Sequence, residues 1–522
     1  MNNYTIINVK NRTAINVKNK DMQMNVTVKW VFTFLFVAAA SMLHAGAYTN
    51  PVLPYDYSDP DVCQAGEDYY MTSSSFNCIP GLQILHSRDL VHWRFVDAAL
   101  RWRVPGTEQA ASDSPEYGCG VWAPSIRFHK GRFYIYYGDP DRGVYCVRSQ
   151  ATSGAVEAFP LEWEEAVLVK PGKGFIDACP LWDEDGRVYL AHALAGSRAG
   201  LKSVLMVCEL TADGLACKTE SRIVFDGHPD HPTSEGPKFY KRNGYYYIMH
   251  PAGGVATGWQ VCLRSRSPYG PYETKVVLAQ GNTDVNGPHQ GAWVGNWFLH
   301  FQDVGVAGRI VHLQPLRWQD DWPVMGNEGE PVSQGNVPDK AVSTIGENAN
   351  PRLFREEFST TELPLSWQWS GNYDARYGFC NATQSMLRLF SYPCDSIPAS
   401  PSLLLQKIPA NRAFIVTAKV RFTPLKKIAG HERAGLIVAG RQSYMLDAPA
   451  NGEWTWLRVT VSQDHDCQFY TSTDGKTYIA VGKPFRAVEG VWIGAKVGLY
   501  CTRDRVKIND SGYMDVDWFE IR

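Results

Sequence analysis

The sequence has little net charge, no closely spaced cysteine pair and no apolar run long enough for a membrane span. Its 51 Lys and Arg nearly balance 53 Asp and Glu, which gives a formal charge of −2. Such a balance offers no electrostatic argument for nucleic acid or an acidic membrane surface as a partner. The 12 cysteines are scattered, and without a CxxC pair they indicate no zinc site.

A short apolar segment near the N-terminus has the pattern of an export signal. Lys29 precedes an apolar run over residues 30–43, and the small residues Ala45-Gly46-Ala47 follow it. The run is shorter than the about 20 residues that a membrane-spanning helix needs, whereas its flanks are typical of a cleaved secretory signal. We therefore expect residues 1–47 to be an N-terminal extension and signal peptide, no stable membrane span, and export to the periplasm or the extracellular space.

Export permits disulfides, and one pair of cysteines is placed to form one. Cys208 and Cys217 flank the turn at Ala212-Asp213-Gly214 and can face each other across a hairpin. Buried free thiols are the alternative.

Aromatic residues are abundant, with 17 Trp and 26 Tyr. They suit sugar binding as flat platforms, but packing within β-sheets accounts for them equally well.

Five polar stations recur along the first part of the chain at a near-constant interval. Three carry an acid, and two carry other polar or aromatic groups: Tyr57-Ser58-Asp59-Pro60, Trp122-Ala123-Pro124, Phe175-Ile176-Asp177, Ser234-Glu235-Gly236-Pro237 and His289-Gln290-Gly291. An aromatic-rich strand follows each station, and a turn signal such as Lys130-Gly131 or Asn243-Gly244 precedes the later four strands. Five copies of one all-β unit would gather these groups on one axis, as in a propeller.

The pattern changes twice after the fifth station. Residues 319–352 are rich in Pro, Gly, Asn and Glu and are predicted to be a linker. Short alternating strands return over residues 353–522, without a helical period of useful length, as expected of a β-sandwich. We therefore predict an all-β protein: a five-bladed β-propeller over residues 48–318, the linker, and an accessory β-sandwich.

The ordered motifs resemble those of glycoside hydrolase family 43, particularly its β-xylosidase and α-L-arabinofuranosidase members. The matching segments cover the whole first domain and include Ser58-Asp59-Pro60-Asp61, His86-Ser87-Arg88-Asp89-Leu90, Trp122-Ala123-Pro124-Ser125, Ser234-Glu235-Gly236-Pro237 and Gly308-Arg309-Ile310-Val311. The C-terminal segment resembles the concanavalin A-like β-sandwich that often follows this propeller. The resemblance implies an inverting mechanism, in which one carboxylate activates water and a carboxylic acid protonates the leaving oxygen.

The resemblance also implies a role for each station. Asp59 corresponds to the general base, Glu235 to the general acid, and Asp177 to a third acid that orients Glu235 and keeps its pKa raised. A neighbouring carboxylate has that effect, since it disfavours ionisation. Taken alone, each acid also fits a purely structural role. These roles are an Asx-turn for Asp59, a buried carboxylate at a strand end for Asp177 and a solvated turn for Glu235. The near-constant spacing of the stations that carry them favours a catalytic role for all three acids.

Other matched positions concern the sugar pocket and a metal ion. Phe76 and Trp122 correspond to apolar walls of the pocket, and Arg309 to an arginine that reaches substrate hydroxyls; blade packing and a salt bridge are the structural alternatives. No cofactor is expected to be required. In some relatives the histidine equivalent to His289 helps hold a metal ion, often calcium, although one histidine without an Asp cluster is weak evidence for calcium.

The function predicted from these residues is an exo-acting inverting glycoside hydrolase that releases xylose or arabinose from plant cell-wall oligosaccharides or polysaccharides. A β-xylosidase is favoured, with an α-L-arabinofuranosidase as the alternative. A non-catalytic carbohydrate-binding propeller is disfavoured because all three acids are present. The retaining fructan-cleaving propellers are disfavoured because their Asn-Asp-Pro-Asn motif is replaced by Ser58-Asp59-Pro60-Asp61.

Overall fold

The structure is a computed structural model that describes residues 46–107, 117–337, 340 and 342–522. The predicted signal peptide therefore lies almost entirely outside the described residues. Within them, helices are few and short: α2 (Gly196–Ala199) and the 3₁₀ turns η2 (Val156–Ala158), η3 (Gly305–Ala307), η4 (Ile397–Ala399) and η5 (Lys426–His431). No helix in the described part of the chain is both long and apolar enough to cross a membrane.

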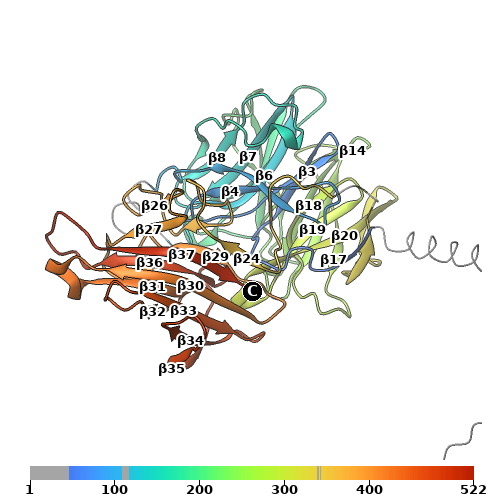
Figure 1. Cartoon of the computed structure of the whole chain (residues 1–522). Helices are drawn as coiled ribbons and strands as arrows, with labels where there is room; N and C mark the ends of the chain where they lie inside the picture. Colours follow the sequence, from blue (N-terminus) through green and yellow to red (C-terminus); the bar gives the residue numbers. More distant parts are fainter. Residues whose placement is uncertain (1–45, 108–116, 338–339, 341) are drawn as a thin grey trace, which may run out of the picture. The chain divides into compact units, whose positions relative to one another are not determined.

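Five antiparallel sheets form the propeller over the first part of the chain (Figure 1). Each has four consecutive strands in sequence order, and the first also carries β23 (Glu347–Asn348) on β5. The first is β2 (Asp61–Ala65), β3 (Asp68–Thr72), β4 (Gly81–Ser87) and β5 (Arg94–Leu100). The second is β6 (Trp122–His129), β7 (Arg132–Asp139), β8 (Gly143–Arg148) and β9 (Val167–Pro171). The third is β10 (Phe175–Trp182), β11 (Val188–Leu194), β12 (Val204–Leu210) and β13 (Arg222–Asp226).

The remaining two sheets repeat this plan. The fourth is β14 (Lys238–Arg242), β15 (Tyr245–Ala252), β16 (Trp259–Ser265) and β17 (Glu273–Ala279). The fifth is β18 (His289–Val294), β19 (Trp297–Asp303), β20 (Arg309–Gln319) and β21 (Trp322–Met325). The predicted five-bladed all-β architecture is confirmed. Each of the five stations lies at or just before the first strand of a sheet, so all five occupy the same structural place.

Local turn chemistry explains the hairpins that follow the stations. At Lys130-Gly131 and Asn243-Gly244 both residues have positive φ, between 46° and 72°, which is the backbone of the tight turns that suit twisted hairpins. Asp320 and Asp321 also have positive φ, 52° and 57°, and they turn β20 back onto β21. The boundary predicted at residue 318 therefore falls inside β20, because an Asp-Asp hairpin turn lies where the composition suggested a linker.

The first and last blades are joined by the segment that precedes β2. Leu53 and Val311 form an antiparallel bridge, with hydrogen bonds of 3.3 and 3.0 Å between their main chains. The Tyr57 amide donates to the Arg309 carbonyl at 2.9 Å. The ring of blades is thus closed by strand pairing close to the first station.

Two packed sheets form the sandwich, which encloses its own core of Phe, Trp, Leu and Val side chains. One sheet has the order β26 (Gly378–Asn381), β27 (Met386–Phe390), β37 (Tyr513–Ile521), β30 (Phe414–Thr423), β33 (Trp454–Val461), β34 (Asp466–Ser472) and β35 (Ile479–Arg486), with β24 (Phe354–Glu356) on β37. The other has β25 (Gln368–Trp369), β29 (Leu404–Lys407), β36 (Lys496–Arg503), β31 (Glu432–Ala439) and β32 (Tyr444–Asp447), with β28 (Tyr392–Pro393) on β36. Further short strands are β1 (Ala47–Thr49), β22 (Gln334–Asn336) and β23 (Glu347–Asn348).

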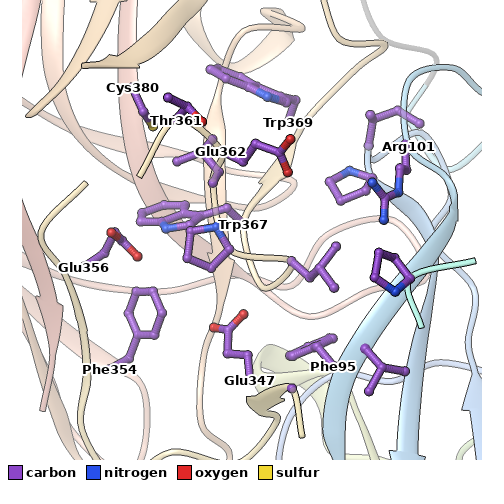
Figure 2. Close-up of a pocket in the computed structure, with 18 of the residues that line it drawn as sticks. Phe95, Arg101, Glu347, Phe354, Glu356, Thr361, Glu362, Trp367, Trp369 and Cys380 are labelled. Atoms are coloured by element: carbon purple, nitrogen blue, oxygen red, sulfur yellow. The ribbon is translucent and has the colours of Figure 1, made fainter. Parts of the chain in front are cut away.

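Main-chain pairing connects the propeller to the sandwich. Ile79 and Trp369 exchange two hydrogen bonds, of 3.0 and 2.6 Å. Next to this bridge lies a cavity of about 850 Å³, lined by propeller residues such as Phe95 and Arg101 and by sandwich residues such as Trp367 (Figure 2). None of the predicted site residues lines this cavity, so its size does not identify it as the site of chemistry.

Candidate active site

Asp59 lies in the loop before β2, in a strained backbone conformation. Its φ is +54°, a region that costs energy for most residues other than glycine and clusters at functional sites. The carboxyl group is buried, and both of its oxygens accept hydrogen bonds. Ser74 Oγ donates to Oδ2 at 2.6 Å, and Arg309 Nη1 donates to Oδ1 at 3.1 Å. The orientation of Asp59 is therefore set by two neighbours far apart in sequence.

Asp177 and Glu235 form a coupled pair on adjacent blades. Asp177 also has a positive φ, +60°, and its Oδ2 accepts a hydrogen bond of 2.7 Å from the Gly236 amide. Burial and the neighbouring Glu235 carboxylate raise the pKa of Asp177 well above its usual range, while the Gly236 amide acts in the opposite direction. Burial and a neighbouring carboxylate thus both favour the protonated form of Asp177.

Glu235 is the more accessible member of the pair. Its side chain is 31% exposed, and its Oε1 lies 2.9 Å from His289 Nε2. Asp177, in contrast, is buried at 3% exposure. Of the two carboxyl groups, Glu235 is therefore the one that a ligand can reach.

His289 contacts Glu235, and its surroundings show whether the predicted metal ion would fit there. The imidazole is fully buried, and its Nδ1 has no hydrogen-bond partner. The described residues contain no group of three or more His, Cys, Asp or Glu side chains placed to hold a metal ion. Calcium takes six to eight oxygen ligands, so these side chains do not fit a directly bound calcium ion. The calcium site stays a prediction.

The other predicted site residues lie around the acids with different exposures. Arg309 is buried and also contacts Asp303, with 3.6 Å between Nε and Oδ2. Trp122 is half-buried, and its indole Nε1 donates to the Gly118 carbonyl at 2.7 Å. Phe76 is only 2% exposed, and its main chain pairs with Val121. Trp122 therefore offers far more surface to a ligand than Phe76 does.

A sandwich residue that the motifs did not reveal lies at the same site. Trp492 belongs to the loop between β35 and β36, has a φ of +63° and is 51% exposed. Its carbonyl accepts a hydrogen bond of 3.3 Å from Ser58 Oγ, and its ring lies edge-on to Trp122 with centroids 6.5 Å apart. Nearby, the Gly494 amide donates to Asp56 Oδ2 at 3.1 Å. The loop is thus anchored to the segment that carries Asp59.

This arrangement suits cleavage of a glycosidic bond. One buried carboxyl group is fixed beside an arginine, and a second, accessible one neighbours a buried carboxyl group whose pKa is raised. Hydrolysis of a glycoside needs a base for water and an acid for the leaving oxygen, and the indole rings of Trp122 and Trp492 provide apolar surface for a sugar face. Fold and site together define a carbohydrate-cleaving propeller enzyme.

Comparisons with known proteins agree with this class. The model of glycosyl hydrolases family 43 matches residues 48–323, and that of the beta xylosidase C-terminal concanavalin A-like domain matches residues 355–448 and 446–522. A putative beta-xylosidase of Xylanibacter ruminicola is 36% identical over 88% of this chain and 86% of its own length. A non-reducing end alpha-L-arabinofuranosidase of Bacteroides ovatus is 28% identical over 75% of this chain and 73% of its own.

Solved structures share the fold. A xylan beta-1,4-xylosidase of Bacillus halodurans superimposes with a TM-score of 0.75 at 21% identity, over 91% of this chain and 99% of that one. The chain belongs to glycosyl hydrolase family 43 and is an inverting glycoside hydrolase.

Proposed function

We propose that this protein is an exo-acting β-xylosidase that removes single xylose residues from the non-reducing ends of plant cell-wall oligosaccharides. The three neighbouring carboxyl groups, with Asp59 fixed by Ser74 and Arg309 and with Glu235 accessible beside the buried Asp177, are the observation that supports the hydrolytic mechanism. The choice of xylose is supported by a relative named as a putative beta-xylosidase that shares 36% identity over most of both chains.

In this proposal Asp59 is the general base and Glu235 the general acid. Asp59 takes a proton from a water molecule, which attacks the anomeric carbon from the face opposite the leaving group. Glu235 gives its proton to the glycosidic oxygen as the bond breaks. Asp177 keeps that proton available, because a second charge on the pair is unfavourable. Arg309 orients Asp59, and both proton transfers proceed through carboxyl groups without a required cofactor.

We also propose that the protein is exported, on the basis of the sequence pattern over residues 29–47. A polymer of the plant cell wall reaches an enzyme outside the cytoplasm, and the signal-like segment is consistent with that substrate.

Cys208 and Cys217 are thiols with sulfur atoms 3.6 Å apart. They are close enough that a rotation of the side chains would permit a disulfide in an oxidising compartment.

Assays on two aryl glycosides test the choice of sugar. We expect kcat/KM for an aryl β-xylopyranoside to exceed that for the matching aryl α-arabinofuranoside. Because the aglycone is the same, the leaving group does not contribute to the ratio, which measures how the enzyme discriminates between the two sugars. A ratio in favour of the arabinofuranoside would assign the alternative activity, and no turnover of either would contradict both proposed specificities.

The early products of xylohexaose cleavage and a substitution of Trp492 test the exo mode of action. The indole and its anchored loop lie against Trp122, where they block passage of a chain beyond the first sugar units. We expect xylose as the sole early product from xylohexaose with the wild type. Trp492→Ala is expected to raise KM for xylobiose several-fold and to leave the fold intact, because the side chain is half exposed. A ladder of intermediate oligosaccharides from the wild type at early times would contradict exo action.

A further inference from the structure

The cavity between the propeller and the sandwich (Figure 2) has features that the proposed mechanism does not use. Its volume of about 850 Å³ lies within the roughly 300–1,000 Å³ of pockets that hold small organic ligands. Such pockets combine apolar and aromatic walls with a few polar groups. The lining of this cavity has both kinds of side chain.

Three aromatic rings of the lining follow one another across the two domains. The ring of Trp102, from the loop after β5, lies 5.7 Å from that of Tyr373, and the ring of Tyr373 lies 6.0 Å from that of Trp369, between centroids. We call Trp102, Tyr373 and Trp369 the aromatic row. Trp102 is 64% exposed, so its indole leaves a large apolar surface in water. The row thus offers flat surfaces, with one exposed end, against which sugar rings can pack.

Trp367 adds a hydrogen-bond donor that the protein does not use. The residue lines the cavity and is only 1% exposed, and its indole Nε1 has no hydrogen-bond partner among the described residues. Its ring neighbours Phe354 and Phe519, with centroids 6.0 and 4.8 Å away, offer no acceptor. A buried N–H group without a partner is costly. A ligand oxygen at this position would remove that cost.

Glutamate side chains supply acceptors to the same cavity. Glu347, Glu356 and Glu362 all line it, and Figure 2 shows them in one view with Trp367. Glu347 accepts a hydrogen bond of 2.6 Å from Ser366 Oγ, which helps to fix its carboxyl group. A carboxylate has about four lone-pair sites, so one such bond leaves most of its capacity to a ligand.

The charges of the lining favour a neutral ligand. Its two arginines are paired with carboxylates outside the lining: Arg101 with Asp97 at 2.8 Å, and Arg355 with Glu357 at 2.6 Å. An anionic ligand would therefore meet the glutamates without a free cation to offset them. A cationic ligand that only donates would leave the N–H group of Trp367 unpaired. A sugar hydroxyl both donates and accepts, so it suits the glutamates and the indole together.

We propose that this cavity is a second, non-catalytic carbohydrate site that binds a neutral xylo-oligosaccharide. The aromatic row packs against the sugar rings, Trp367 Nε1 donates to a sugar oxygen, and the glutamates accept from sugar hydroxyls. The choice of xylose rests on the proposed function, whereas the choice of a neutral saccharide rests on the lining itself. Such a site keeps a xylan chain close to the enzyme while its ends are cleaved, because a second binding event on one chain raises the effective concentration.

Calorimetric titration of Glu235→Gln with xylohexaose tests the proposal, because this variant should leave the ligand uncleaved. We expect two binding sites per chain. Adding Trp102→Ala should weaken one of them at least about tenfold, since a large aromatic contact is lost. The fold should persist because the indole is mostly exposed. Ile479→Ala, which trims a 69% exposed side chain of β35 away from the cavity lining, is the matched control and should keep both sites.

A charged saccharide tests the choice of a neutral ligand. Trigalacturonic acid should not displace xylohexaose from the site that Trp102→Ala weakens, and displacement at equal concentration would overturn that choice. Xylohexaose binding that Trp102→Ala leaves unchanged would overturn the second site altogether. Wild-type turnover by Glu235→Gln would instead refute the proposed acid, so the two failures are distinguishable.

Discussion

Asp59→Asn is expected to lower kcat on a xylo-oligosaccharide by at least about 10²–10⁴-fold, because water then has no base to take its proton. The fold should survive the change. Asparagine tolerates the positive φ at this position better than most residues do, and Arg309 keeps its contact with Asp303. The measurement is kcat with xylobiose, alongside circular dichroism to verify folding.

Two controls separate loss of the base from disturbance of Arg309. Asp303→Asn removes the other carboxylate beside that arginine and should lose far less activity. Azide should restore turnover to Asp59→Asn by attacking in place of water, and proton NMR should show a product of inverted anomeric configuration. A near wild-type rate for Asp59→Asn would remove this residue from the mechanism.

Glu235→Gln is expected to lose activity in a manner that depends on the leaving group. With xylobiose, whose departing hydroxyl needs a proton, we expect a loss of about 10²–10⁴-fold. With a dinitrophenyl β-xyloside, whose leaving group departs as a stable anion, the loss should be small. The amide oxygen of glutamine can still accept from His289, so the pocket geometry is retained. Equal losses on both substrates would mean that Glu235 acts on binding and not on proton transfer.

The sequence predicted the part of the site that repeats. Asp59, Asp177 and Glu235 were found because blade geometry places the start of every inner strand on the same axis, so a periodic motif reports a spatial cluster. The strained φ of Asp59 and Asp177 had no sequence signal of its own. The end of the fifth blade was misplaced because an Asp-Asp turn resembles linker composition.

The contribution of Trp492 could not be predicted from local pattern. Ser58 and Trp492 are separated by 434 residues, and the contact depends on how the sandwich packs on the propeller.

The closure of the propeller ring by late residues has a consequence during synthesis of the chain. The proposed base Asp59 emerges early, but its guanidinium partner Arg309 follows 250 residues later. The Gly494 amide that binds Asp56 comes later still. A polypeptide released before those residues are synthesised would carry the acids without the geometry that orients them. A fragment that ends before Arg309 is therefore expected to hold Asp59 less firmly and to cleave sugars more slowly than the full chain.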